Sequence, residues 1–296
     1  WNSAYGMVYE NGKYWISSGS STTGRGIFYA VNDAGFLVDT IDINYPTMRE
    51  SQGLAFDGTN FWYVERKTAR CDIFKVDING TVLDSITSSQ LFGTSVYMGG
   101  AGWEGSGLWI SVYYPDAIVA LYKINTTTKQ VVDTIDFLNF APGQLQPQGI
   151  TVKGDTLFFV NDGFQGIDKI YAVSLMTEDT LFTFNPPEQP GSRQNPRGLA
   201  WDGNYFWLLA EPVGASSGRQ LFKYDLGGSG SPGITLLTPN INFGNVMIDS
   251  TLTQNISVLN YGTADLILTT PAISNSVFTI TVPFPITVQP GQIVNI

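Results

Sequence analysis

Three carboxylates and one tyrosine occupy a recurring position of the chain, and their types could support acid–base chemistry or cation binding. Glu65, Asp162 and Glu211 each follow a short apolar segment, as does Tyr113. Paired carboxylates can act on a glycoside, and clustered carboxylates can bind Ca²⁺. The alternative is a set of solvated loop charges that form no site, because spacing alone does not fix their geometry. Since the residue type varies between positions, no symmetric metal ring is predicted.

The composition excludes most other catalytic chemistry. The chain of 296 residues has no His and a single Cys, Cys71. An internal disulfide, a zinc site built on His or paired Cys, and Ser-His-Asp or Cys-His catalysis are therefore excluded. Cys71 is expected to pack as a small hydrophobic residue or to be free. We expect no cofactor and no bound metal.

The charge and hydropathy of the chain disfavour some classes of partner and indicate where the protein is located. The chain has 15 basic and 25 acidic residues and a net charge of −10, which disfavours nucleic acid as a partner. No run of 18 apolar residues occurs, so no membrane-spanning helix is expected. Only 14% of the residues are charged, and Gly is abundant. This composition favours an extracellular or cell-surface protein.

An internal repeat defines the elements that must position the candidate residues. Each of five repeats opens with a glycine, spaced 47 to 49 residues from the next: Gly6, Gly53, Gly100, Gly149 and Gly198. Nine residues after each glycine comes a large aromatic residue: Trp15, Trp62, Trp109, Phe158 and Trp207. Repeats of this length with four short strands are typical of β-propeller blades. The fold class is therefore all-β, with a five-bladed propeller over residues 1–227.

The second repeat illustrates the predicted strands and turns. Asp57-Gly58 predicts a hairpin turn, and the strands 61–64, 73–77 and 81–86 follow it. No helical period of useful length appears. The fifth repeat lacks a fourth strand, which we expect either from residues before Trp1 or from residues 233–238.

The repeated tryptophans could have either of two roles. Exposed aromatic rings bind carbohydrate by stacking, whereas equivalent positions in every blade of a propeller are packed between blades. We expect packing, because six of the seven Trp share two repeat positions. The candidate ligand site therefore lies at the rim of the propeller, where the second strands end.

The blade sequence resembles a known group. Residues 196–203 (Pro-Arg-Gly-Leu-Ala-Trp-Asp-Gly), followed by Phe206-Trp207 and by residues 221–225, resemble the blades of secreted bacterial and archaeal propellers of the NHL and glutamine-cyclotransferase-like types. The resemblance covers all five repeats. It implies the fold but no particular activity, because such blades occur in proteins of unrelated function.

A second domain follows the repeats. Residues 228–235 are rich in Gly, Ser and Pro and predict a linker. Residues 236–296, including Asn260-Tyr261-Gly262, resemble the immunoglobulin-like domain called choice-of-anchor D or ASH-like. A complete immunoglobulin-like sandwich has about seven strands, more than this segment provides. Either the polypeptide continues beyond Ile296, or another subunit completes the sandwich by donating a strand.

These features leave two classes of function open. The favoured class is a non-catalytic extracellular structural or interaction protein that assembles with other copies, or with other surface proteins, through its C-terminal domain. A filament or surface layer would result from a contact that does not close. The alternative is an enzyme of the propeller funnel that uses Glu and Asp, either glycoside-active or cyclotransferase-like.

Three sequons add candidate modification sites. Asn79, Asn125 and Asn255 each begin an Asn-x-Ser/Thr triplet, the acceptor sequence for N-glycosylation. The first two fall in predicted hairpin turns, and turn chemistry explains an Asn there equally well.

Overall fold

The computed structural model describes residues 4–19, 25–45, 50–67, 70–137, 145–162, 168–186, 196–210, 219–224, 232–262, 264–289 and 291–296. The chain divides into two compact units. The first, here the propeller unit, comprises residues 1–152 and 157–224, and the second unit comprises residues 153–156 and 225–296. No helix in the described ranges is both long enough and apolar enough to cross a membrane.

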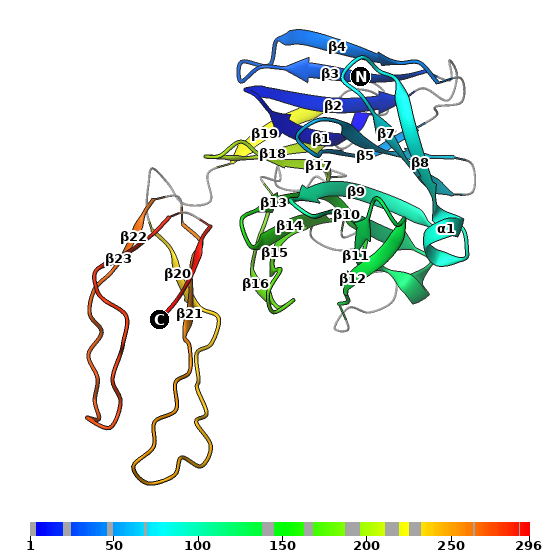
Figure 1. The fold of residues 1–296 in the computed structure, drawn as a ribbon. Coiled ribbons are helices and arrows are strands. Elements are labelled where there is room, and N and C mark those ends of the chain that lie inside the picture. The colour runs from blue at the N-terminus through cyan, green and yellow to red at the C-terminus, as the bar shows by residue number, and fades with distance from the viewer. Residues whose placement is uncertain are drawn as a thin grey trace. The chain divides into compact units, whose positions relative to one another are not determined.

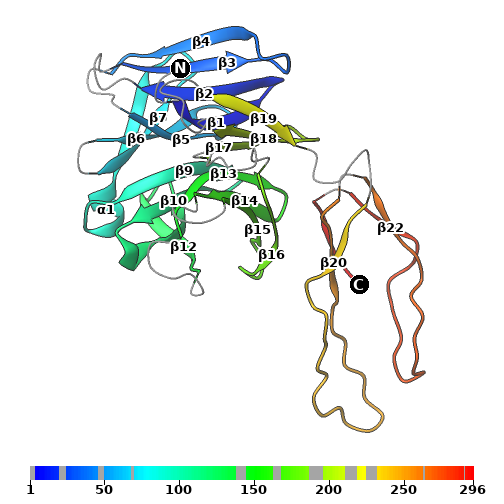
Figure 2. The same ribbon diagram turned by 180° about the vertical axis from the view of Figure 1, so that it is seen from behind.

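Five antiparallel sheets make up the propeller unit, and each is a meander in chain order (Figures 1 and 2). Blade one contains β1 (Ala4–Glu10), β2 (Lys13–Gly19), β3 (Gly26–Val31) and β4 (Leu37–Ile43). Blade two contains β5 (Glu50–Phe56), β6 (Phe61–Arg66), β7 (Cys71–Val76) and β8 (Val82–Thr87). Blade three contains β9 (Tyr97–Glu104), β10 (Gly107–Tyr114), β11 (Ala120–Asn125) and β12 (Gln130–Ile135).

The last two blades differ in strand number. Blade four contains β13 (Pro147–Lys153), β14 (Thr156–Asn161), β15 (Lys169–Ser174) and β16 (Thr180–Phe184). Blade five contains β17 (Pro196–Trp201), β18 (Phe206–Ala210) and β19 (Gln220–Tyr224), with no fourth strand among the described residues. The prediction of an all-β propeller is confirmed.

Backbone contact between the repeat glycines closes the ring. A Cβ added at Gly53 would lie 2.7 Å from the backbone of Gly100 and Ala101 in the next inner strand. The same holds around the ring, and a Cβ at Gly198 would lie 2.8 Å from Met7 Cβ and from the carbonyl oxygen of Tyr5. Only glycine permits so close an approach of two strands. Blade five therefore packs directly against blade one.

The hydrophobic cores lie between neighbouring blades. Trp62 is 2% exposed and packs with Met98 and Leu108 of the next blade. Trp207 of blade five packs with Met7 and Ile16 of blade one. Because both faces of a second strand are covered, β6, β10, β14 and β18 are almost continuously buried. The predicted packing role of the repeated Trp is confirmed.

Local chemistry explains the turns and the short helices. In the first turn of blade two, Asp57 Oδ1 accepts hydrogen bonds from the backbone N–H of Thr59 and Asn60 at 2.9 and 2.7 Å, and Gly58 takes a φ of 92°. Helix α1 (Ser88–Phe92) begins with a capping box in which Thr87 and Gln90 bond each other's backbone. This helix was not predicted, although Thr87-Ser88-Ser89-Gln90 is its sequence signature. A single 3₁₀ turn, η1 (Asp116–Ile118), follows β10.

The second unit has two small sheets. One has the order β20 (Ile234–Leu236), β21 (Ser257–Asn260), β24 (Ile293–Asn295), and the other pairs β22 (Leu266–Leu268) with β23 (Ile286–Val288). The buried Asn260 joins them, because its Nδ2 donates to the carbonyl oxygens of Ala264 and Val288 at 2.7 and 2.8 Å. Since β20 pairs with β21, the expectation that residues 233–238 provide the fourth strand of blade five is wrong.

Candidate functional site

The antiparallel meander brings two sets of strand ends to the same rim of the propeller unit. First strands begin there, and second strands end there. The set that we call the rim cluster comprises Tyr5, Glu50, Arg66, Tyr97, Tyr113, Asp162 and Arg197. It contains two of the predicted carboxylate and tyrosine candidates, Tyr113 and Asp162, and lies beside a third, Glu65.

Cations and carboxylates alternate in the rim cluster. Arg197 Nη1 lies 3.6 Å from Asp162 Oδ2, whose side chain is 4% exposed. Arg66 Nη1 lies 3.8 Å from Glu50 Oε2. These separations exceed those of a direct hydrogen bond, so the pairs interact mainly through their charges. Each described carboxylate of the cluster therefore faces an arginine.

Aromatic rings hold the arginines in place. The Arg197 guanidinium lies 5.1 Å from the centroid of the Tyr5 ring, and that of Arg66 lies 5.1 Å from the Tyr97 ring. Tyr97 in turn stacks on Tyr113, with 6.0 Å between ring centroids. A cation placed over an aromatic face is attracted by the ring quadrupole. The rim therefore presents two positioned guanidinium groups among tyrosines.

Tyr113 is protonated at neutral pH. Burial raises the pKa of its hydroxyl to about 12, and the nearby Cys71 thiol adds to this, whereas Arg66 and Arg197 lower it. Both arginines therefore act on one hydroxyl. Tyr113 can serve as a hydrogen-bond donor toward a ligand at the rim, but not as a phenolate base.

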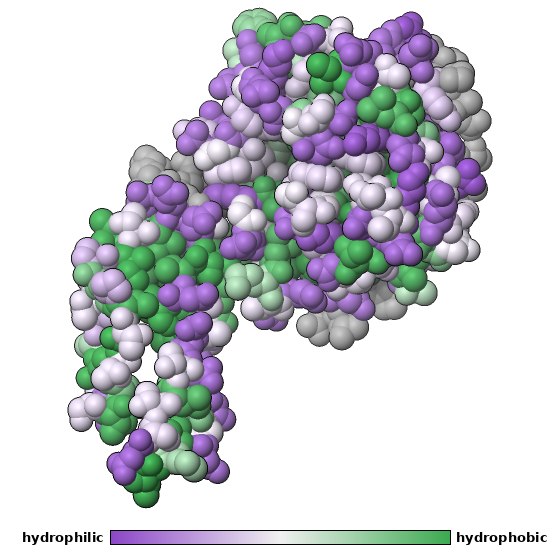
Figure 3. Space-filling model, viewed as in Figure 1, coloured by the Kyte–Doolittle hydropathy of each residue, from purple (hydrophilic) through white to green (hydrophobic). Residues whose placement is uncertain are grey.

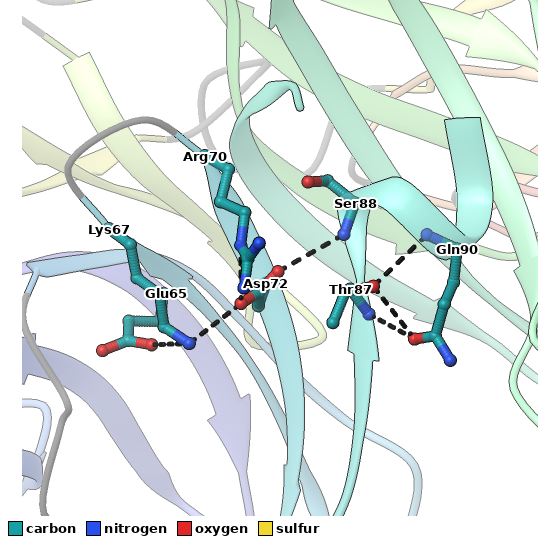
Figure 4. Close-up of polar contacts among 7 residues, drawn as sticks. All are labelled: Glu65, Lys67, Arg70, Asp72, Thr87, Ser88 and Gln90. Carbon is teal, nitrogen blue, oxygen red and sulfur yellow. Dashed lines mark hydrogen bonds and ion pairs between the residues drawn. The ribbon is translucent and has the colours of Figure 1, made fainter. Parts of the chain in front are cut away.

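Glu65 belongs to a neighbouring ion-pair network at the end of β6. Figure 4 shows Lys67 between two carboxylates: its Nζ lies 3.7 Å from Glu65 Oε2 and 2.9 Å from Asp72 Oδ2. Asp72 also accepts from Arg70 Nε at 3.3 Å and from the backbone N–H of Ser88 at 3.4 Å. Because Asp72 is 2% exposed, these contacts tie the segment after β6 to the start of helix α1.

The carboxylates predicted from the sequence thus have separate partners. Glu65 is paired with Lys67, and Asp162 with Arg197. Glu211 lies outside the described residues. Within the described ranges, no group of three acidic or Cys side chains is arranged to hold a metal ion.

Among the described residues, the inner strands enclose only a small space at the propeller axis. The space there measures about 130 Å³ and does not admit a water molecule. Its lining is the inner-strand backbone, including Gly53, Gly100 and Gly149. The described lining therefore leaves no room for a ligand between the inner strands.

An acid–Trp–Lys arrangement recurs in three blades and was not predicted from the sequence. In blade two, Trp62 Nε1 donates to Asp57 Oδ2 at 2.9 Å, and Lys75 Nζ lies 5.3 Å from the centre of the Trp62 ring. Blade three repeats this with Glu104, Trp109 and Lys123, and blade five with Asp202, Trp207 and Lys223. The signal is an acidic residue four positions after the repeat glycine. This arrangement fixes the strands and leaves the Trp rings unavailable for carbohydrate.

The arginine partners at the rim were also missed. Asp162 directly follows a second strand, β14, whereas Arg197 lies at the start of a first strand, β17. The signal is the position just before each repeat glycine, which holds a large polar residue in four of five repeats: Tyr5, Gln52, Gln148 and Arg197.

The remaining predicted residues are not members of the rim cluster, although Cys71 lies opposite Arg66 across strands β6 and β7. Cys71 is buried, and the backbone N–H of Met98 lies 3.2 Å from its sulfur. Asn79 is exposed in the turn between β7 and β8, and Asn255 is exposed before β21. Asn125 ends β11, and its Oδ1 accepts from the backbone N–H of Thr127 and Thr128 at 3.0 and 2.9 Å.

The blades and their closed ring define the protein as a five-bladed β-propeller carrying a small second unit. The crystal structure of Myxococcus xanthus glutaminyl cyclase is similar, with a TM-score of 0.51, and the match covers 76% of this chain and 92% of that chain. The sequence identity is 11%, so the similarity shows the fold alone. No family model matches the chain, and no curated protein matches it.

Proposed function

We propose that the protein is a non-catalytic extracellular or cell-surface interaction protein that assembles with further copies of itself through its second unit. The propeller unit then serves as a rigid scaffold, and the second unit as an immunoglobulin-like arm of the choice-of-anchor D type. The observation that carries the proposal is the combination of open sheet edges and exposed apolar side chains in the second unit.

The sheet edges are open because the two sheets of the second unit have few strands. Within the described residues, β20 and β24 each have a strand on one side only, and β22 and β23 pair only with each other. An isolated pair of strands is marginally stable in water, and an unpaired edge is a template for another chain. Strand addition would provide both the missing hydrogen bonds and cover for the sheet faces.

Apolar side chains are exposed in the segments that connect these strands. Met247 is 78% exposed and Ile248 is 93% exposed between β20 and β21, and Val277 is 75% exposed between β22 and β23. Figure 3 shows hydrophobic residues, in green, gathered over the second unit. Isolated exposed apolar residues are ordinary, but a group of them favours a protein-binding surface.

A second copy is the partner that the proposal specifies. If the surface that donates a strand differs from the one that accepts it, the contact is heterologous and propagates into a filament or layer.

Assembly of the 296-residue chain tests the proposal. Light scattering and negative-stain images across a concentration series should show oligomers or filaments. The double variant Met247→Lys/Ile248→Lys should be monomeric, since two lysines oppose burial of this segment. Met176→Lys is the matched control, because Met176 is 58% exposed on the propeller unit. A chain that stays monomeric at every concentration contradicts the proposal.

A second candidate is an enzyme at the rim, of the glutamine-cyclotransferase-like kind. It is favoured by one observation: a fully buried carboxylate, Glu65, next to a rim with two positioned arginines. In such a reaction the α-amine of an N-terminal glutamine attacks its own side-chain carbonyl carbon, and ammonia leaves. Glu65 would assist the proton transfers, and Arg197 and Tyr113 would hold the substrate's carbonyl groups.

Ammonia release from a peptide with N-terminal glutamine tests this candidate. Activity in the wild type that falls by about a hundredfold in Glu65→Gln supports it, since one general acid–base residue contributes on that order. Equal ammonia release with and without the protein excludes it. Asp116→Asn, outside the rim cluster, is the control for an unspecific effect of charge removal.

A further inference from the structure

Blade five ends at its third strand, whereas the four preceding blades each have a fourth. No described strand pairs with the outer edge of β19, and β20 is paired with β21 instead. Blades one to three show what a fourth strand must look like in this protein, because their third and fourth strands share one register.

In blades one to three, the shared register sets an Asp-Ser/Thr-Ile triplet against the third strand, whereas blade four has Phe182, Thr183 and Phe184 at these positions. In blade two Asp84, Ser85 and Ile86 lie opposite Lys75, Phe74 and Ile73. In blade three Asp133, Thr134 and Ile135 lie opposite Lys123, Tyr122 and Leu121. In blade one Asp39, Thr40 and Ile41 lie opposite Ala30, Tyr29 and Phe28.

The third strand of blade five has the same three-residue pattern. Trp207 pairs with Lys223 as Trp62 pairs with Lys75 and as Trp109 pairs with Lys123. Leu221, Phe222 and Lys223 therefore stand where Ile73, Phe74 and Lys75 stand in blade two. The complementary triplet is the only part of the pattern that blade five lacks within the described residues.

The burial of side chains on the third strands shows the consequence of the missing fourth strand. Ile73 and Leu121 are both 0% exposed, whereas Leu221 at the equivalent position is only half-buried. Lys223 is exposed, whereas Lys75 and Lys123 are half-buried between an acidic turn and a fourth strand. Leu221 and Lys223 thus lack, among the described residues, the fourth-strand neighbours that their counterparts have, and Lys223 lies instead over the Tyr205 and Trp207 rings.

We propose that the outer edge of β19 binds an added antiparallel strand from a partner polypeptide, with Asp opposite Lys223, Ser or Thr opposite Phe222, and Ile opposite Leu221. The main chain of β19 supplies the hydrogen bonds of strand addition, and the side chains supply the selectivity. Ile covers Leu221, and Asp pairs across the strands with Lys223. This acceptor edge is on the propeller unit and is independent of assembly through the second unit.

A peptide with the sequence of residues 81–88 is the probe, because it contains the Asp84-Ser85-Ile86 triplet in its native context. Amide hydrogen exchange of the 296-residue chain should show new protection over residues 220–224 when the peptide is added. A scrambled peptide should give none. A peptide with Lys in place of the Asp should bind about tenfold more weakly, because two like charges then lie opposite each other.

Charge reversal on the protein provides the matched variant. Lys223→Glu reverses the charge of an exposed side chain that also lies over the Tyr205 and Trp207 rings, so its tryptophan fluorescence is first compared with that of the wild type. The folded variant should invert the preference, so that the Lys peptide binds more tightly than the Asp peptide. Protection of residues 220–224 before any peptide is added overturns the proposal, since the edge is then already covered. Equal binding of the scrambled peptide, or protection confined to β20–β24, also overturns it, and neither result bears on assembly through the second unit.

Discussion

The Tyr14 hydroxyl of blade one donates a hydrogen bond to Asp202 Oδ2 of blade five over 2.8 Å. The Tyr14 ring also packs on Trp207, with 4.4 Å between ring centroids. Asp202 is the acid of the blade-five acid–Trp–Lys arrangement, so a residue that fixes one blade also joins the first blade to the last. The two partners are 188 residues apart in the chain, which makes this contact a lock on the closed ring.

Tyr14→Phe should loosen this lock without disturbing the packing. The variant keeps the ring on Trp207 and removes one donor to a charged acceptor, so we expect a loss of about 1–2 kcal/mol in the free energy of unfolding. Urea denaturation followed by tryptophan fluorescence measures it. Tyr45→Phe is the control, because the Tyr45 ring packs on Phe74 of blade two and not at the contact between blades one and five. Equal losses in both variants would show that the hydrogen bond to Asp202 is not the cause.

The carboxyl group of Asp202 should make stability depend on pH in the acid range. Burial alone would raise its pKa, but hydrogen bonds from Trp207, from the backbone of Tyr205 and Asn204, and from Tyr14 outweigh burial and lower it. A pKa that is lower in the folded state than in the unfolded state means that the ionised group stabilises the fold. This contribution is complete above the unfolded value of about 4 and is lost as the pH falls through the folded pKa.

Asp202→Asn isolates that contribution. The difference in unfolding free energy between wild type and variant should be constant from pH 7 to about 4 and should shrink at lower pH. Urea titrations at a series of pH values measure it. Asp116→Asn, at an exposed carboxylate of the turn η1, should show a small difference throughout. A difference for Asp202→Asn that persists undiminished in acid would show that its charge is not the cause.

The blades could be predicted because glycine and tryptophan recur at positions that the fold imposes. Gly53 touches the next inner strand and Trp62 fills the space between blades, so each repeat must place these residue types at the same offsets. Asp57 and Gly58 likewise predict a turn, because only local hydrogen bonds are needed to form it. These features depend on short stretches of chain and appear directly in the sequence.

The rim could be predicted only in part, because its partners come from distant repeats. Asp162 and Arg197 are brought together by two different blades, and no local pattern connects them. Lys67 and Asp72 draw Glu65 into a separate ion-pair network, so its side chain does not join a common carboxylate group with Asp162. Which charges neutralise each other is decided by tertiary packing rather than by spacing along the chain.

Gly53→Ala should destabilise the ring more than any alanine placed in an outer turn. The new Cβ would meet backbone atoms of Gly100 and Ala101 that cannot move without shifting a neighbouring blade. We expect a loss of about 3 kcal/mol, in the range of severe overpacking. Gly58→Ala is the matched control: its Cβ meets nothing within 4 Å, but its φ of 92° is strained for alanine, which costs about 1–2 kcal/mol. Comparable losses at both positions would contradict the close-approach account.

The Cys71 thiol should be unreactive in the folded protein. Burial raises the pKa of its thiol to about 12, and the backbone hydrogen bond from Met98 and the charge of Arg66 only partly oppose this. Since the thiolate is the reactive form, almost none is present at pH 8. A disulfide-exchange reagent such as Ellman's reagent should therefore label Cys71 only at the rate at which the propeller unit opens, and rapidly in denaturant. Val132→Cys in a Cys71→Ala background is the control, because Val132 is 55% exposed and its replacement should react at once. Immediate labelling of the native wild type would show that blades two and three separate readily at this position.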